Sequence, residues 1–239
     1  MKTLKISSLF IWLGILLASL LTSCTSDINR SKLGYVDKSY EFDDFKKIKL
    51  EGGYNVKLIQ GDSCQVTVSA SEDLQRNIKV TVEDELLHIK TQIKNIGTEE
   101  VKITIAFKNI EDIKVEGGVM MTTPQSINLN NLSLNVEGGA SIEMQMYADT
   151  FRAKAAGGVN MEFSGKVNTF SAISEGAANI DADHLESQDV TCRVSGIGNA
   201  SVYALKNLNA SVDGVGKIGY RGDPEIIKKV NGIGAVYKR

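Results

Sequence analysis

The densest group of chemically useful side chains lies in one short polar segment and consists of Asp181, Asp183, His184 and Glu186. Carboxylates gathered in this way could form a local cation site, and the histidine could act as a metal ligand or a general base. Because the remaining ligands would have to come from neighbouring segments of the chain, we treat this group as a weak candidate and predict no metal site.

The rest of the sequence holds no catalytic constellation. The HExxH, CxxC, GxSxG and P-loop motifs are absent, and so is the glycine- and aspartate-rich calcium repeat. The other histidine, His88, alternates with Leu87 and Ile89, which predicts a solvent-facing side chain on a strand. We therefore predict that the protein is not an enzyme, and we assign it no catalytic, cofactor-binding or metal-binding residue.

Arg221, Gly222 and Asp223 spell an integrin-type tripeptide. A tripeptide of such common residues arises easily by chance. The alternative is a turn that Pro224 makes rigid, and we favour this structural interpretation over a receptor-binding role.

The first 23 residues have the features of a bacterial lipoprotein signal peptide. Lys2 and Lys5 precede an apolar run at positions 9–21, which is too short to be a comfortable bilayer span. The run ends in Leu-Thr-Ser-Cys at positions 21–24, which resembles a lipobox. We predict cleavage before Cys24 and lipidation of its thiol, with residues 24–40 as a flexible tether. The alternative is an ordinary signal peptide followed by an incidental cysteine.

Such a signal peptide would direct export, and the lipid on Cys24 would anchor the cleaved chain to the outer membrane, on the periplasmic or the surface side. Cleavage before Cys24 would remove two of the 27 basic residues and none of the 29 acidic ones, so the formal net charge would fall from −2 to −4. This balance gives no general attraction to nucleic acid or anionic lipid, and we predict no nucleic-acid partner. Cys64 and Cys192 could pair in an exported protein, but they lie far apart in the repeat order, so we favour two buried free thiols.

Glycines recur through the second half of the chain at nearly constant spacing. The steps between them are 21, 19, 19, 20, 18 and 18 residues, and we call these positions the register glycines: Gly117, Gly138, Gly157, Gly176, Gly196, Gly214 and Gly232. A repeat of this length indicates stacked supersecondary units that bury a shared core.

Residues at fixed offsets from the register glycines share their character. Side chains two, four and six residues before each glycine are mostly apolar, and so are those four and six residues after it. The intervening residues are mostly polar, and this alternation is the period of a strand with one buried face. The offset of minus two shows the pattern: Val115, Val136, Ala155, Ser174, Val194, Val212 and Val230.

Each repeat therefore predicts two short strands around a glycine bend, with a short third segment that closes the coil. The repeat has no room for helical crossovers, so we predict an all-β parallel β-solenoid with coils of about 18–21 residues stacked ~4.8 Å apart. Glycine suits the bend because of its backbone freedom or because stacked backbones approach closely. The last three coils carry their second glycine one position later, at Gly198, Gly216 and Gly234, so we expect a different corner there.

Two polar columns face outward in this arrangement. An acidic column directly before the register glycines could hold a cation or a sugar, but we favour a solvated outer face; it comprises Glu116, Glu137, Glu175 and Asp213. A second column, three residues after the glycines, could bind a ligand, but we favour an amide ladder that stabilises the turns; it comprises Asn160, Asn179 and Asn199.

The N-terminal half is less regular. Gly52 obeys the register, but the next register glycine is Gly117, 65 residues later, which corresponds to about three coils. Residues 78–82 and 86–89 around the turn at 83–85 predict a hairpin. We therefore predict a single domain at 41–239, with irregular coils at 41–112 that cap regular coils at 113–239. Charged residues near the other edge are expected to protect it: Lys228, Lys229, Lys238 and Arg239.

These features together resemble a known family. The lipobox, the segment Phe45-x-x-Ile48-x-Leu50-x-Gly52 and the ordered glycine words are similar to the putative auto-transporter adhesin family with a head GIN domain, found largely in Bacteroidota envelope proteins. The resemblance covers roughly residues 41–239, including the closing stretch from Tyr220 to Gly234. It implies a right-handed parallel β-helix in an exported lipoprotein, and it brings no catalytic residues with it.

Three functions remain open on this basis. The first, which we favour, is a non-enzymatic, adhesin-like envelope module that presents a surface to a protein or glycan partner. The second is a carbohydrate-active β-helix enzyme, which would need carboxylates or basic residues gathered in a groove. The third is a structural or signalling-linked envelope protein without a ligand of its own.

Overall fold

The computed structural model describes residues 34–92 and 100–239, and Gly34–Arg239 form one compact unit. The predicted signal peptide and Cys24 lie outside the described residues. None of the helices in the described part of the chain is long and apolar enough to span a membrane.

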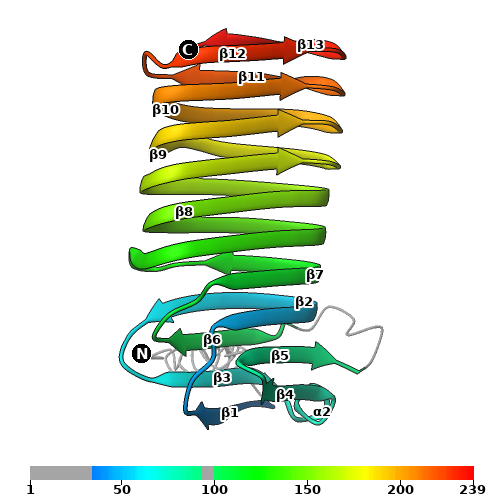
Figure 1. The fold of residues 1–239 in the computed structure, drawn as a ribbon. Helices are drawn as coiled ribbons and strands as arrows, with labels where there is room; N and C mark the ends of the chain where they lie inside the picture. Colours follow the sequence, from blue (N-terminus) through cyan, green and yellow to red (C-terminus); the bar gives the residue numbers. More distant parts are fainter. Residues whose placement is uncertain (1–33, 93–99) are drawn as a thin grey trace, which may run out of the picture. The chain divides into compact units, whose positions relative to one another are not determined.

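The expected parallel β-helix is confirmed, because strands of successive coils pair in parallel from β2 to the C-terminal end of the unit (Figure 1). The longest strand, β8, has 48 residues and runs through more than two coils. The coil strands are β2 (Lys47–Gln60), β7 (Asp112–Thr122), β8 (Ile127–Ser174), β9 (Ala177–Val194), β10 (Ile197–Val212), β11 (Val215–Arg221), β12 (Glu225–Val230) and β13 (Ile233–Lys238).

The N-terminal part differs from the expected three coils. β2 pairs directly with β7, with Gly52 beside Gly117, so one full coil precedes the regular series. On its other side β2 pairs in parallel with β5 and β6, which together form an irregular layer below that coil. Residues before β2 and between β2 and β7 complete a cap with antiparallel pairs, because β3 pairs antiparallel with both β1 and β6, and β4 with β5. The cap comprises β1 (Tyr35–Phe42), β3 (Cys64–Ser71), α2 (Glu72–Gln75), β4 (Ile78–Glu83), β5 (Leu86–Thr91) and β6 (Lys102–Phe107).

Two further expectations concern this cap. Residues 35–40 belong to β1 rather than to a tether, because their backbone pairs with β3. The predicted hairpin is confirmed as β4 and β5, and its turn places Asp84 and Glu85 at φ values of 49° and 61°. Two consecutive positive φ angles are typical of the type I′ turn that matches the twist of a hairpin.

The core lies between the faces of the coils, where the apolar columns meet. Phe151, Phe163 and Phe170 are buried there, and the rings of Phe151 and Phe163 cross edge to face with centroids 4.7 Å apart. Cys64 and Cys192 are both buried and free, as expected.

The register glycines form a ladder at one corner of the coils. A Cβ atom on any of them from Gly117 to Gly232 would clash with the backbone of the register glycine one coil below. The corner does change along the chain, but one coil earlier than expected. Among the register glycines, φ is positive at Gly52, Gly117, Gly138 and Gly157, and it is not positive from Gly176 onward. The change therefore begins before the shifted second glycine appears.

Candidate functional site

An open groove with a volume of about 560 Å³ lies on the third face, the short segment that closes each coil. The groove crosses successive coils of β8 and β9, so each coil contributes the same few positions. The lining residues are Asn128, Leu129, Asn130, Tyr147, Ala148, Asp149, Lys166, Val167, Asn168, Glu186, Gln188 and Leu205.

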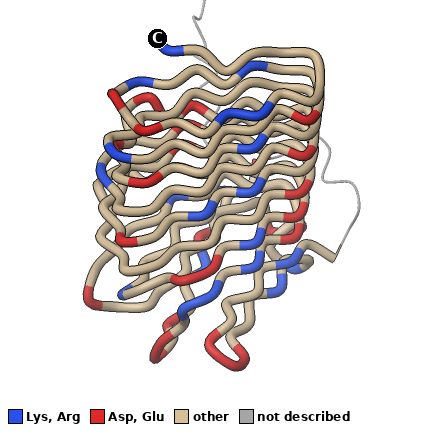
Figure 2. The backbone as a smooth tube through the Cα atoms, turned by 45° about the horizontal axis from the view of Figure 1, so that its top comes forward, with Lys and Arg blue, Asp and Glu red and all other residues tan. Residues whose placement is uncertain are grey.

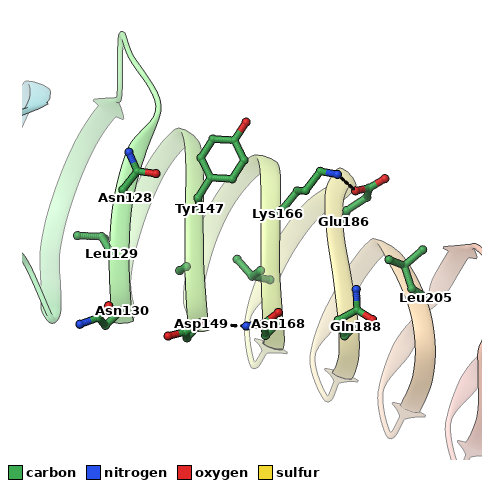
Figure 3. A pocket seen from close by; sticks show the side chains of 12 residues that line it. Asn128, Leu129, Asn130, Tyr147, Asp149, Lys166, Asn168, Glu186, Gln188 and Leu205 are labelled. Carbon is green, nitrogen blue, oxygen red and sulfur yellow. Dashed lines mark hydrogen bonds and ion pairs between the residues drawn. The ribbon is translucent and has the colours of Figure 1, made fainter.

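Strand alternation arranges these side chains in two outward rows with a buried floor between them (Figure 3). Leu129 and Val167 on the floor are 7% and 4% exposed. One row consists of Asn128, Tyr147, Lys166 and Glu186, and the other of Asn130, Asp149, Asn168 and Gln188. The corner before this face needs a glycine, since Gly165 has φ +115° and a Cβ there would clash with the carbonyl oxygen of Met146.

Several polar groups of the groove are available to a ligand. Among the described residues, the side-chain amides of Asn128, Asn130 and Gln188 and the hydroxyl of Tyr147 make no hydrogen bond. Tyr147 is 45% exposed, so part of its ring is accessible to a ligand. An exposed aromatic ring beside unpartnered amides is a common arrangement in polar recognition sites.

The charged groups of the groove are engaged with one another. Lys166 Nζ lies 2.6 Å from Glu186 Oε2, and this hydrogen bond and ion pair raise the pKa of Lys166 above its ordinary value. Asn168 Nδ2 donates to Asp149 Oδ1 over 2.8 Å. The pairs join successive coils, so they support the third face as well as lining it.

The group at 181–186 is not a cation site in this structure. The carboxylate of Asp183 is buried and pairs with Arg239, while Glu186 pairs with Lys166 and His184 is exposed. A bulge in β9 causes this separation, because the register with β8 shifts beside Asp183. Within residues 34–92 and 100–239, no group of three or more His, Cys, Asp and Glu side chains is placed to hold a metal ion.

The acidic column lies beside a basic column, which occupies the position three residues before the register glycines. This basic column was not predicted from the sequence. Figure 2 shows acidic residues above one another along one edge of the coils, with basic residues next to them. The ion pairs between the columns include Lys114–Glu116 at 2.6 Å, Lys154–Glu175 at 2.8 Å and Arg193–Asp213 at 3.0 Å. These partly exposed pairs support the interpretation of a solvated outer face over a cation or sugar site.

The asparagine column forms a short ladder. Asn160, Asn179 and Asn199 lie beside one another in register, and Asn179 Nδ2 donates to Asn160 Oδ1 over 3.1 Å. The amides of Asn160 and Asn179 therefore bond to each other across two coils rather than to the turn backbone.

His88 faces a carboxylate on the neighbouring strand. Its Nε2 lies 3.1 Å from Glu51 Oε1, and Glu51 also contacts Lys49 and Lys90. Hydrogen bonds from the two lysines lower the pKa of Glu51 to about 2. The histidine is partly exposed on its strand, close to what the alternation predicted, and it belongs to a charge cluster outside the groove.

The integrin-type tripeptide is held by its surroundings. The guanidinium of Arg221 lies 5.0 Å from the centre of the Tyr203 ring and donates to the carbonyl oxygen of Asp183. Gly222 has φ +93°, and a Cβ there would clash with the carbonyl oxygen of Ala204. These contacts explain the tripeptide as part of a turn.

The groove was not predicted from the sequence, in which the third segment indicated only the closure of each coil. The signal was present at ten and eight residues before the register glycines, where tyrosine, amide and charged side chains replace the simple apolar alternation. Only an alignment of these outward positions would have found it.

The fold and the groove define a class: a single-stranded parallel β-helix with a ligand-sized depression on its third face. The chain belongs to the family described as "Putative auto-transporter adhesin, head GIN domain", which matches residues 44–224. This family membership confirms the resemblance inferred from the glycine words. No curated protein gives a match.

Solved structures of relatives have the same fold. A putative adhesin from Bacteroides fragilis superimposes with a TM-score of 0.81 at 22% identity, covering 86% of this chain and 97% of that one. A putative adhesin from Parabacteroides distasonis has a TM-score of 0.69 at 21% identity, with the same coverage. A putative lipid binding protein from Parabacteroides distasonis has a TM-score of 0.62 at 20% identity, again with that coverage.

Proposed function

We propose that this protein is a non-enzymatic, adhesin-like module of the cell envelope that binds a partner protein or glycan in the groove on the third face. The observation that carries the proposal is the alignment of Tyr147 with unpartnered amides along that groove. Family membership supports an adhesin-like role, and the groove supplies a surface for it.

The chemistry of the groove favours binding over catalysis. A lysine that acts as a general base needs a lowered pKa, whereas contact with Glu186 raises the pKa of Lys166. Asp149 accepts a hydrogen bond from Asn168 and is not part of the Lys166–Glu186 ion pair. Each charged group thus has a structural partner in the absence of a substrate.

A carbohydrate-active enzyme is the second candidate, because the groove does hold a carboxylate and a lysine within 2.6 Å of each other. This candidate predicts new reducing ends or unsaturated products when the protein is incubated with polysaccharides, and their loss in Lys166→Ala and Glu186→Gln variants. The proposed function predicts no turnover by the wild type.

A lipid ligand is suggested by the name of one relative, a putative lipid binding protein. The groove favours a more polar ligand, since Tyr147 is the one exposed large apolar side chain in its lining and the floor is buried. An acyl chain would find little apolar surface there.

The test is a binding screen with the soluble 25–239 fragment. In two solved relatives, 97% of the chain aligns with 86% of this one. A fragment of about this extent is therefore expected to fold on its own. We expect retention of a glycan or protein that is lost when groove side chains are removed. Binding that survives every groove substitution would refute the groove as the binding surface.

We further propose that the module is exported and lipid-anchored at Cys24 to the outer membrane. The proposal is supported by the lipobox-like end of the apolar run and by membership in an adhesin-like family. The anchor would leave the β-helix free to present its groove away from the membrane or within the periplasm.

A further inference from the structure

We infer that the groove takes a neutral, extended oligosaccharide that lies across the coils, parallel to the solenoid axis. The inference rests on the proposed function of the groove as a binding surface and names the ligand class. Its evidence is the repetition of the lining, the open tyrosine ring, the unpartnered amides and the balance of charge.

The repetition of the lining suits a polymer of similar units. Successive coils of a β-solenoid lie ~4.8 Å apart, so each row of the groove offers one side chain at that interval. Asn130, Asp149, Asn168 and Gln188 occupy the same position in four consecutive coils. An extended chain of sugars would therefore meet a new polar group at every step along the axis.

Tyr147 offers the flat apolar surface that a sugar ring needs. It is 45% exposed and lies between Asn128 and Lys166 in its row. The C–H face of a pyranose can cover the ring while its hydroxyls remain in reach of polar neighbours, a use that matches the amphipathic character of tyrosine.

The unpartnered amides match the hydroxyls of a sugar. Each amide of Asn128, Asn130 and Gln188 carries both donors and an acceptor, as each hydroxyl does, so both members of a pair can be satisfied. Because these amides make no hydrogen bond to other described residues, binding would not have to break one.

The charge of the groove argues for a neutral ligand. Lys166 is the single cation of the lining, and it already pairs with Glu186. Asp149 adds a negative charge to the opposite row. A uronic acid or sulfate group would therefore meet more repulsion than attraction, whereas neutral hydroxyls would displace only water.

A peptide fits this surface less well. Coils of β8 and β9 pair with neighbouring strands on both sides, so their backbone offers no free edge for an added strand. The buried floor residues Leu129 and Val167 leave no deep apolar pocket for an anchoring side chain.

The first experiment measures retention of the 25–239 fragment on immobilised neutral polysaccharides (mannan, mixed-linkage β-glucan, xylan and dextran) and on anionic ones (polygalacturonate and heparin). We expect retention on at least one neutral polymer and none on the anionic polymers. Retention on anionic polymers alone, or on no polymer, would overturn the ligand class.

The second experiment compares two matched tyrosines. Tyr147→Ala should weaken binding to the retained polymer about tenfold, because it removes the stacking surface. Tyr237→Ala is the control, since Tyr237 is equally exposed at 46% but lies on β13 outside the groove. Equal loss in both variants, or loss in neither, would contradict the inference.

The third experiment uses charge to test selectivity. Glu186→Gln should raise retention on polygalacturonate above that of the wild type, because Lys166 loses its partner and the lining keeps only Asp149 as a negative charge, while Lys166→Gln should not. Equal retention of the two variants on polygalacturonate would overturn the argument that the charge of the lining selects a neutral ligand.

These outcomes separate the inference from the proposed function. A protein partner that is captured by the wild type and lost with Tyr147→Ala would keep the groove as the binding surface and overturn the glycan. A glycan that binds equally to all groove variants would overturn both.

Discussion

A Cβ atom on Gly138 would lie 2.6 Å from the carbonyl oxygen of Gly117, the register glycine one coil below. Real Cβ atoms do not approach other atoms so closely. The repeated glycine is therefore explained by the distance between stacked backbones as well as by the positive φ of 124° at Gly138. The glycines shape the corner, and the groove lies on a different face.

Gly138→Ala should lower the free energy of unfolding by at least about 2 kcal/mol, because the added methyl group meets backbone and the φ angle is strained. Gly139→Ala is the matched control, since a Cβ there has no atom within 4 Å and φ is not positive. Urea denaturation of both variants checks the prediction. Equal midpoints would contradict the ladder.

The regular coils could be predicted from the sequence because two simple signals coincide there. Inward residues such as Val136 and Ile142 alternate with polar ones, and the glycine spacing gives the coil length. Both signals arise from local geometry that recurs in every coil, so an irregular residue in one repeat does not hide the pattern that the other repeats share.

The cap and the groove could not be predicted in the same way. The pairing of Gln65 with Ala106 joins segments that share no period, and no glycine marks it. The chemistry of the groove depends on which outward side chains are already paired. Lys166 forms an ion pair with Glu186, whereas the amide of Asn130 makes no hydrogen bond to a described residue. Such pairing depends on the register between coils, which the glycine spacing alone does not define.

Cys24→Ser should release the protein from membranes, because the thiol is the predicted attachment point of the lipid. Cell fractionation followed by detection of the chain checks this expectation. Cys64→Ser is the control and should leave the protein with the membrane, since Cys64 is buried in the folded unit. Unchanged membrane association of the Cys24 variant would refute the lipoprotein prediction.

Glu51 should contribute stability that depends on pH. Lys49 and Lys90 lower its pKa from 4.5 to about 2, so the folded state binds this proton less tightly than the unfolded state. The contribution is therefore present above pH 4.5 and is lost as the pH falls toward about 2.

Urea midpoints measured from pH 6 down to pH 2 test this dependence, with the pH range chosen around the shifted pKa of about 2. Glu51→Gln should flatten the fall that the wild type shows between pH 4.5 and pH 2. Glu137→Gln is a control, because Glu137 is exposed in the same column and has no ion pair with a described residue. Parallel curves for the wild type and Glu51→Gln would disprove the assignment.

Arg239→Ala should destabilise the last coils. Asp183 has a side chain that is only 10% exposed, and its paired oxygen would lose the Arg239 guanidinium. An uncompensated buried carboxylate costs about 2 kcal/mol or more, and Asp183→Asn in the same chain should restore part of the loss. Lys238→Ala should have little effect, since its partner Asp223 is 92% exposed.

The thiol of Cys192 should be unreactive in the native protein. Burial raises its pKa from 9.0 to about 12, so at neutral pH the reactive thiolate is about a thousandfold rarer than for an ordinary thiol. In the 25–239 fragment with Cys64→Ala, Cys192 is the single thiol, and a chromogenic disulfide reagent should label it only after urea unfolds the chain. The labelling rate should then follow the unfolding rate rather than the reagent concentration. Rapid labelling without denaturant would show that the coil around Cys192 opens locally.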